Sequence, residues 1–506
     1  MNRTYYFLKN TFVTALYQAC LMITGFLLPK IMLTFYGSEI NGLVSSVTQF
    51  INYITLVEAG LSGATVYALY KPLADKDRVQ ISGIVVAAKK FYTISGWIFT
   101  LLVVLLAIIY PWFVTSEHLS YLDILLLVLI IGTSGTIDFF LLGKYRAILT
   151  ADQKQYVISV SSLLYCVLNT ALIAIFAVFG FNVVAARLGA LSAVALRSIM
   201  IGAFCKKHYA YLDFHQKPIT SALNKRWDAL FLQILGVIHS GSPIALATVF
   251  TSLKEVSVYA VFNVVANGVA SILGIFTTGV GAGFGDLIAR KEEKALKRAY
   301  SDFEFMYYML IAFVYSVMMI QIMPFINLYT AGLSDADYSR PLLGFLFTLN
   351  GFLYSLKTPQ GMMVISAGLY KETKWQTVIQ AVIAVVGGGV LGKLFGLPGI
   401  LVGMCLSNLY RDIDLCFFIP KHVTGLPVME SIKSAGVAVL GFIAISAIGF
   451  QILLQCNTYV DWIGNSILMC TLAAAILMVF AFALRKALLI QSVTRVLGII
   501  KSKVGK

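Results

Sequence analysis

Long apolar runs separated by short polar segments fill the chain from about residue 10 to residue 484. Most runs hold about 20 residues or more, and about 20 helical residues cover the ~30 Å hydrocarbon core of a bilayer. Backbone groups in a bilayer must be hydrogen-bonded within the protein, so each run is predicted to be a helix. The pattern predicts an all-α polytopic membrane protein with about 14 transmembrane helices.

The predicted helices fall into three groups. An N-terminal bundle within residues 1–204 has six helices, at residues 10–35, 41–70, 91–114, 121–142, 155–179 and 181–204. A basic cytoplasmic linker, 205–227, leads to a second six-helix bundle within 228–420, with helices at 228–252, 256–286, 303–329, 341–367, 373–394 and 397–420. Two further helices, 434–454 and 462–484, lie within residues 421–484, and a basic amphipathic tail, 485–506, follows.

The distribution of Lys and Arg predicts which gaps face the cytoplasm. All but seven of the 38 Lys and Arg residues lie in alternate gaps and at the two ends of the chain. The opposite gaps at residues 111–120 and 455–461 have none. Since cytoplasmic loops are enriched in Lys and Arg, both termini are predicted to be cytoplasmic.

Composition excludes several classes of function. The chain is 59% hydrophobic and 12% charged, whereas about 25% charge is usual in soluble domains. Its net charge of +15 is spread over short loops, which favours membrane lipids as partners and not nucleic acid. The seven cysteines lack metal-ligand spacing, and no P-loop is present, so no metal or other cofactor is predicted. A membrane polymerase is disfavoured because the outer gaps are short.

The two halves of the chain resemble each other at a shift of about 215 residues. Pro29 then matches Pro243, and Glu39 matches Glu255. The amides of one half match those of the other, namely Gln49 and Asn52 with Asn263 and Asn267. Because six is an even number of crossings, both repeats start on the same side of the membrane and have the same orientation. The interface between such repeats commonly holds the substrate cavity. Two pseudo-symmetric bundles are therefore predicted.

The seven remaining cations are the candidates for chemistry. Three lie in outer loops and are interpreted as surface charges: Lys254, Arg340 and Lys393. Four lie within predicted helices: Lys30, Arg187, Arg197 and Lys357. A charge within a bilayer faces a cavity or a partner by default. These four are predicted to line an aqueous cavity, and the alternatives are snorkelling or pairing with Glu58 or Asp138.

Polar and acidic groups supply further candidates. Glu58 is predicted to pair with a cavity cation or to take up a coupling proton, and His239 lies mid-helix near two serines and Pro243. Five amides either line the cavity or join helices to each other: Gln49, Asn52, Asn263, Asn267 and Asn350.

Several short motifs occur in a fixed order along the chain. The first half carries LPK at 28–30, YGSEINGL at 36–43, EAGL at 58–61, YALYKPLADKD at 67–77 and GKYRAILTADQK at 143–154. The second half carries TPQG at 358–361 and GLPGI at 396–400. With these motifs the chain resembles the polysaccharide repeat-unit flippases of the multidrug/oligosaccharidyl-lipid/polysaccharide exporter superfamily over nearly its whole length.

The resemblance implies a V-shaped pair of six-helix bundles plus two C-terminal helices. It also implies alternating access that moves an undecaprenyl-diphosphate-linked oligosaccharide from the inner to the outer leaflet of the bacterial plasma membrane. Arg187, Arg197, Lys357 and Lys30 would bind the diphosphate. The resemblance further implies an ion gradient as driving force, with the ion unspecified, and polysaccharide polymerases and glycosyltransferases as partners.

Two relatives in the same superfamily are the nearest alternatives. An ion-coupled multidrug or metabolite antiporter would typically carry an acid in its first helix, but residues 10–35 contain Lys30 and no Asp or Glu. The peptidoglycan-precursor flippase uses several cavity arginines early in its chain, and the first two helices here contain none.

Overall fold

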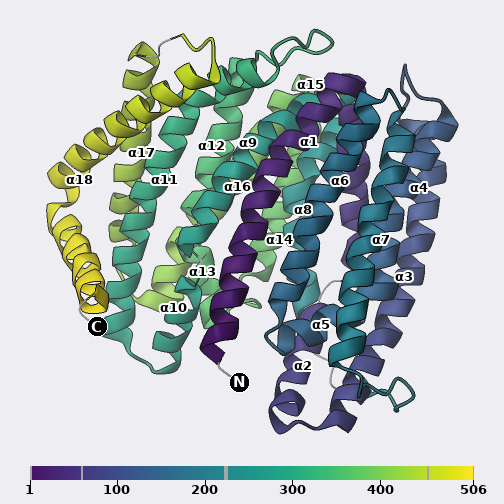
Figure 1. The fold of residues 1–506 in the computed structure, drawn as a ribbon. Helices are drawn as coiled ribbons and strands as arrows, with labels where there is room; N and C mark the ends of the chain where they lie inside the picture. Colours follow the sequence, from purple (N-terminus) through teal and green to yellow (C-terminus); the bar gives the residue numbers. More distant parts are fainter. Residues whose placement is uncertain (1–2, 59–60, 221–225, 278, 453–454, 505–506) are drawn as a thin grey trace. The chain divides into compact units, whose positions relative to one another are not determined.

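The computed structural model describes residues 3–58, 61–220, 226–277, 279–452 and 455–504, and every regular element among them is helical (Figure 1). Parts of five predicted segments lie outside the described residues: the helices 41–70, 256–286 and 434–454 at 59–60, 278 and 453–454, the linker at 221–225 and the tail at 505–506. The chain divides into two compact units, residues 1–260 and 261–506. The predicted boundary at the linker stays a prediction.

Unit 1 contains the first eight α-helices and the start of the ninth. Their bounds are α1 Arg3–Ile54, α2 Leu61–Asp75, α3 Arg78–Phe113, α4 Tyr121–Ile137, α5 Gly143–Ala151, α6 Gln155–Val178, α7 Val183–His208, α8 Arg226–Phe250 and α9 Leu253–Thr277. Unit 2 continues with α10 Val280–Ala289, α11 Glu293–Tyr329, α12 Pro341–Leu356, α13 Thr358–Ala367, α14 Lys374–Val382, α15 Gly388–Phe395, α16 Leu397–Ile419, α17 Val428–Ile452 and α18 Tyr459–Val504.

The boundary between the first two predicted helices differs from the expectation. Helix α1 runs on to Ile54 and changes direction at Gly37, whose φ of 81° is readily adopted only by glycine. The prediction of one continuous helix at 41–70 is wrong. Its first part belongs to α1, a 3₁₀ turn follows at Thr55–Glu58, and α2 begins at Leu61.

Other predicted helices are interrupted at residues that disturb helical hydrogen bonding. The predicted helix at 256–286 splits into α9 and α10 around Gly279, which has a φ of 85°. The one at 341–367 breaks at Lys357, because Pro359 lacks an N–H group and disfavours helical geometry before it. Wider π turns occupy Asp138–Leu142 and Ile383–Gly387. Such interruptions are tolerated within a membrane when neighbouring groups satisfy the freed backbone.

The multi-pass membrane architecture is confirmed, but the number of 14 crossings is not. Ten helices among the described residues are long and apolar enough to span a bilayer. The first of them, Lys9–Asp75, has 67 residues, enough for two crossings. Helix α16 is absent from the ten, and it carries three charged residues, Arg411, Asp412 and Asp414.

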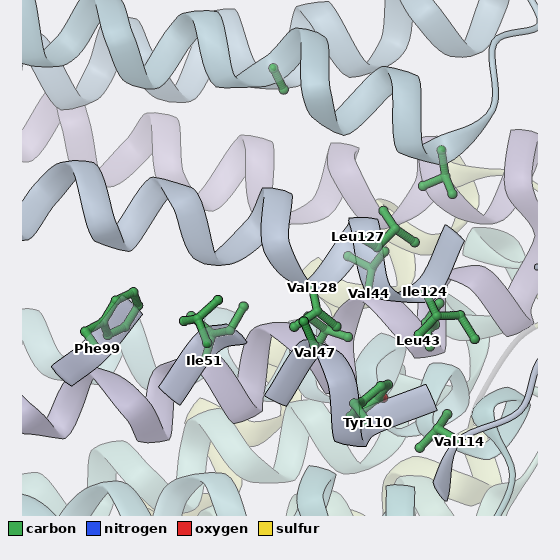
Figure 2. Close-up of a cluster of buried hydrophobic side chains, with 14 of the residues drawn as sticks. Leu43, Val44, Val47, Ile51, Phe99, Tyr110, Val114, Ile124, Leu127 and Val128 are labelled. Carbon is green, nitrogen blue, oxygen red and sulfur yellow. The ribbon is translucent and has the colours of Figure 1, made fainter. Parts of the chain in front are cut away.

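The core of unit 1 forms where α1 packs on α3 and α4. Figure 2 shows apolar side chains from these three helices: Leu43, Val44, Val47, Ile51, Phe99, Tyr110, Val114, Ile124, Leu127 and Val128. All of them are buried. Burying one such side chain is worth roughly 1.5–3 kcal/mol relative to leaving it exposed to water. The Tyr110 hydroxyl donates to Ser46 at 2.7 Å, so the polar end of this ring is also satisfied.

Helices of the two predicted repeats meet inside unit 1. Asn41 on α1 donates to Ser257 on α9 at 2.8 Å, and Thr248 on α8 donates to Ser46 at 2.7 Å. Asn41 and Ser257 are 216 positions apart, which is close to the predicted repeat shift. Equivalent positions of a two-fold arrangement contact each other at the axis, so this contact agrees with parallel repeats. The pseudo-symmetry of complete bundles stays a prediction.

Gly42 makes the closest backbone approach in this contact. A Cβ atom at position 42 would lie 1.8 Å from the Leu253 carbonyl oxygen, and the backbone cannot move aside cheaply. We expect Gly42→Ala to destabilise the protein by about 1–3 kcal/mol in a denaturant titration. Gly25→Ala on the same helix is the matched control, because no atom lies within 4 Å of its added Cβ. Equal stability of the two variants would contradict the close packing.

The predicted orientation can be tested at two exposed positions. Thr115 lies in the gap between α3 and α4, and Ala74 lies near the end of α2. Relative to the parent chain, Thr115→Cys should react with a membrane-impermeant thiol reagent from outside the cell. Ala74→Cys should react only after the membrane is opened. The reverse pattern would overturn the predicted topology.

Candidate functional site

The charged groups of unit 1 gather around Asp138, at the start of the π turn that links α4 to α5. Its carboxylate accepts a hydrogen bond from Arg146 on α5 at 2.7 Å and another from Arg197 on α7. The Arg197 side chain is only 11% exposed. π turns often occur at functional sites, and this one leads directly to the carboxylate.

Glu58 completes this group, called here the Asp138 cluster (Glu58, Tyr92, Asp138, Arg146 and Arg197). The Tyr92 hydroxyl donates to Glu58 at 3.4 Å, and the Arg146 guanidinium interacts electrostatically with both acids. Two carboxylates therefore face two guanidinium groups, so the formal charges balance. Arg197 also stacks on the Tyr165 ring, with its guanidinium carbon 4.6 Å from the ring centroid.

The cluster bears on two predicted residues, Arg197 and Glu58. A cavity role and pairing with an acid were both predicted for Arg197, and pairing with a cation or uptake of a proton for Glu58. In the structure, both residues belong to a network of opposite charges. Arg146 falls in a basic gap between two predicted helices, and nothing in the local residue pattern indicates that a helix carries it to Asp138. The eight-residue spacing from Asp138 to Arg146 becomes meaningful only with the intervening π turn.

Arg187 is different, because its charge is not balanced by an acid. It lies on α7, ten residues before Arg197 and therefore about 15 Å away along the helix. Its Nε atom is buried without a hydrogen-bond partner, and no described residue forms an ion pair with it. Tyr36 and Tyr165 lie near enough to interact electrostatically with it. Arg187 is thus a cation at a partly buried position among aromatic hydroxyl groups.

Lys357 organises a polar network in unit 2, called here the Lys357 network (Asn350, Lys357, Gln380 and Asn408). The Lys357 ammonium donates to Asn408 Oδ1 at 2.5 Å and lies 4.7 Å from the Tyr354 ring centroid. Asn408 in turn donates to Asn350 Oδ1 at 2.9 Å. Lys357 is therefore held directly by a neutral amide, and the Asp412 carboxylate interacts with its charge electrostatically.

One further predicted cation, Lys30, lies apart from these groups. Lys30 is half-buried on α1, one position after Pro29, and it has interacting groups of its own. Its placement tests neither a cavity role nor snorkelling, so both stay predictions.

The predicted polar residues do not converge on one site. Gln49 lies against Gly241, where an added Cβ would come within 2.0 Å of the Gln49 amide nitrogen. Asn52 and Asn267 are exposed. Asn263 and His239 are half-buried. Gln49 therefore helps α1 meet α8, Asn350 belongs to the Lys357 network, and a substrate role for the others stays a prediction.

Buried acids in unit 2 were missed by the sequence interpretation. Arg411 is not among the seven candidate cations, yet it lies within α16 and pairs with Asp414 at 2.5 Å. Asp412 and Glu304 are also buried within helices. The available signal was the run of charged residues at 411, 412 and 414 directly after an apolar stretch.

One group among the described residues has the composition of a metal site: Glu39, Glu117 and His118. The Glu39 carboxylate accepts from the Glu117 backbone N–H at 2.7 Å and contacts His118 Nδ1 at 2.8 Å. Protein groups thus already engage both of its oxygens, and hydrogen bonding accounts for the grouping without an ion.

Removing the charge of Asp138 should be destabilising. Asp138→Asn leaves Arg146 and Arg197 without the carboxylate that both contact, and a hydrogen bond to a charged group contributes about 1.5–3 kcal/mol. Denaturant unfolding of the purified variant measures this loss. Asp75→Asn, at an exposed position of α2, should change stability by less than about 0.5 kcal/mol. Equal effects of the two substitutions would show that the Asp138 cluster is not a buried network.

Comparison with solved structures identifies the fold of this chain. No family model matches the sequence, and no curated protein matches it. Among solved structures, the lipid II flippase MurJ in an inward closed conformation is similar with a TM-score of 0.67 and 13% identity, over 94% of this chain and 100% of that chain. An inward-facing multidrug resistance MATE family transporter of the MOP superfamily gives a TM-score of 0.66 and 16% identity, over 80% of this chain and 95% of that chain.

A MATE structure in the bent conformation is also similar, with a TM-score of 0.54 and 14% identity over 85% of this chain and 96% of that chain. These likenesses cover most of the chain and nearly all of each neighbour, so they describe the whole architecture and not one helical pair. The apolar helices and these likenesses agree: this chain has the fold of the transporters of the MOP superfamily.

Proposed function

We propose that this protein is a flippase that moves an undecaprenyl-diphosphate-linked oligosaccharide from the inner to the outer leaflet of a bacterial plasma membrane by alternating access. The observation that carries the proposal is Arg187, a partly buried guanidinium that no described acid neutralises. A membrane protein retains such a group at a cost of several kcal/mol, so the charge has a use.

The electrostatics of unit 1 favour an anionic substrate. Arg146 and Arg197 are balanced by Asp138 and Glu58, so Arg187 contributes the excess charge of this region. A diphosphate offers several acceptor oxygens to a guanidinium and gains a charge-assisted hydrogen bond as it leaves water. The nearby Tyr36 and Tyr165 hydroxyls can add hydrogen bonds to phosphate or sugar oxygens. The prenyl tail of such a substrate remains in the bilayer while its head group crosses.

An ion-coupled multidrug or metabolite antiporter is the second candidate. It is supported by the MATE structures, whose TM-scores reach 0.66. A cationic drug would be repelled by Arg187, because like charges in a low-dielectric site are strongly unfavourable. The MurJ structure, which matches 94% of this chain, supports a lipid-linked substrate. We therefore prefer the flippase, with glycosyltransferases supplying its substrate and a polysaccharide polymerase consuming the product.

Substitution of Arg187 tests the proposal directly. In proteoliposomes, we expect the wild-type protein to translocate a fluorescent polyprenyl-diphosphate sugar, and Arg187→Gln to reduce the rate about tenfold or more. Arg187→Lys, which keeps the charge, should retain part of the activity. Arg290→Gln serves as control, because Arg290 is 65% exposed and pairs with Asp286.

Three outcomes would count against this function. Translocation that is unchanged in Arg187→Gln would remove Arg187 from the mechanism. Transport of a cationic dye, together with no transport of the lipid-linked sugar, would favour the antiporter. An equal loss in Arg290→Gln would point to a general effect of charge on the vesicles.

A further inference from the structure

Three lysines of unit 1 come together at a place that has no part in the proposed function. They are Lys89 on α3, Lys144 on α5 and Lys206 on α7, and they are called here the lysine triad. The Lys89 and Lys144 ammonium groups each lie 5.2 Å from the centroid of the Phe214 ring. The charges of Lys89 and Lys206 both act on Lys144, so this half-buried ammonium is repelled by two neighbouring cations.

No described acid balances the lysine triad, since none of its ammonium groups forms an ion pair within the described part of the chain. The carboxylate of Asp213 accepts from the backbone N–H of His215 at 2.9 Å. Asp152, which follows α5, pairs with Lys154 instead. Like charges held together in this way repel one another and favour the binding of an anion.

The linker after α7 holds the Phe214 ring beside the lysine triad. The Asp213 N–H donates to Ser82 Oγ at 3.2 Å. The Ile219 N–H donates to the Gly83 carbonyl oxygen at 3.1 Å, so the linker is tied to α3 on both sides of Phe214. The ring also packs against buried apolar side chains, and its face attracts cations. The fold thus brings the ammonium groups to one place, and the lysines are not merely scattered over the surface.

Exposed apolar side chains lead away from the lysine triad. Leu141 precedes Lys144 by three residues and is 50% exposed. Ile199 precedes Lys206 by seven residues, on the same face of α7, and is 65% exposed. Exposed apolar side chains on membrane-spanning helices contact lipid, so the triad lies where apolar surface gives way to the headgroup region. The linker and the gap that contains Lys144 are both predicted to be cytoplasmic.

We propose that the lysine triad binds the phosphate of an anionic phospholipid of the cytoplasmic leaflet. One phosphate offers several oxygens to the three ammonium groups and relieves their repulsion. The acyl chains of the lipid remain beside the exposed apolar side chains at Leu141 and Ile199. A soluble phosphate carries the same charge but gains nothing from that apolar surface. The site does not depend on the transported substrate, whose proposed partner is Arg187.

A lipid at this site would bear on the Asp138 cluster. Helix α5 carries Lys144 two residues before Arg146, and α7 carries Lys206 nine residues after Arg197. The bound phosphate therefore joins the two helices that bring both arginines to Asp138. Because the lipid binds the folded protein and not the unfolded chain, it should stabilise the fold.

Lipid binding to the purified protein tests the site without any transported substrate. In detergent, phosphatidylglycerol should raise the apparent Tm of the wild-type protein more than an equal amount of phosphatidylcholine does. The triple variant Lys89→Gln, Lys144→Gln and Lys206→Gln should lose this difference. It should also bind fluorescent phosphatidylglycerol about tenfold or more less tightly, since each lysine beside an anionic lipid contributes about fivefold.

A charge-matched control removes three other exposed lysines, in Lys90→Gln, Lys207→Gln and Lys294→Gln. The first two directly follow members of the lysine triad in sequence and do not act on its half-buried member. We expect this variant to bind phosphatidylglycerol like the wild-type protein. An equal loss of affinity in both triple variants would reveal a general attraction to basic surface and would overturn the proposal.

Other results separate the site from its alternatives. If the wild-type protein does not prefer phosphatidylglycerol to phosphatidylcholine, the proposal is overturned. A Tm that rises with inorganic diphosphate and not with the lipid identifies a site for soluble anions and also overturns it. If the triple variant does not fold, Lys144→Gln replaces it, and unchanged lipid affinity in that variant is contradictory. Without lipid, Lys144→Gln should be at least as stable as wild type, because repulsion is removed; a purely structural lysine would give the opposite result.

Discussion

The low dielectric of the membrane is the constraint on which this structure depends, because each buried charge needs a partner, a ligand or a route to water. Unit 1 meets it with the Asp138 cluster, in which two acids balance two guanidinium groups. Unit 2 meets it differently, with amides around Lys357 and hydroxyl and amide donors around Glu304. Among the described charges, Arg187 has no acid that balances it, and the proposed function centres on it.

The two units hold their unusual charges in different ways. In the proposed function, Arg187 of unit 1 offers a positive charge to the diphosphate of a lipid-linked sugar. In unit 2, Asn408 fixes the Lys357 ammonium one helical turn before Asp412, and the ammonium interacts electrostatically with that carboxylate.

Interrupted helices make these placements possible. The π turn at Asp138–Leu142 aims Asp138 and α5 so that Arg146 returns to the carboxylate. The break at Lys357 separates α12 from α13, which lets Gln360 turn its amide toward Glu304 and Tyr308. Regular helices through both regions would carry the same residues around the helix in fixed 100° steps and would not bring these groups together.

Bilayer thickness and backbone hydrogen bonding allow few alternatives, so the helical class, the membrane and the presence of rare intramembrane charges can be inferred from the residues alone. The residues also indicate a repeat near 215 positions, with which the Asn41–Ser257 contact agrees. Which charges balance one another depends on the folded chain: Arg197 joins Asp138, Lys357 joins Asn408 and interacts electrostatically with Asp412, and Arg187 has no described acid beside it. Pairing depends on which helices meet and on turns at a few Gly, Pro and π positions, and hydropathy records neither.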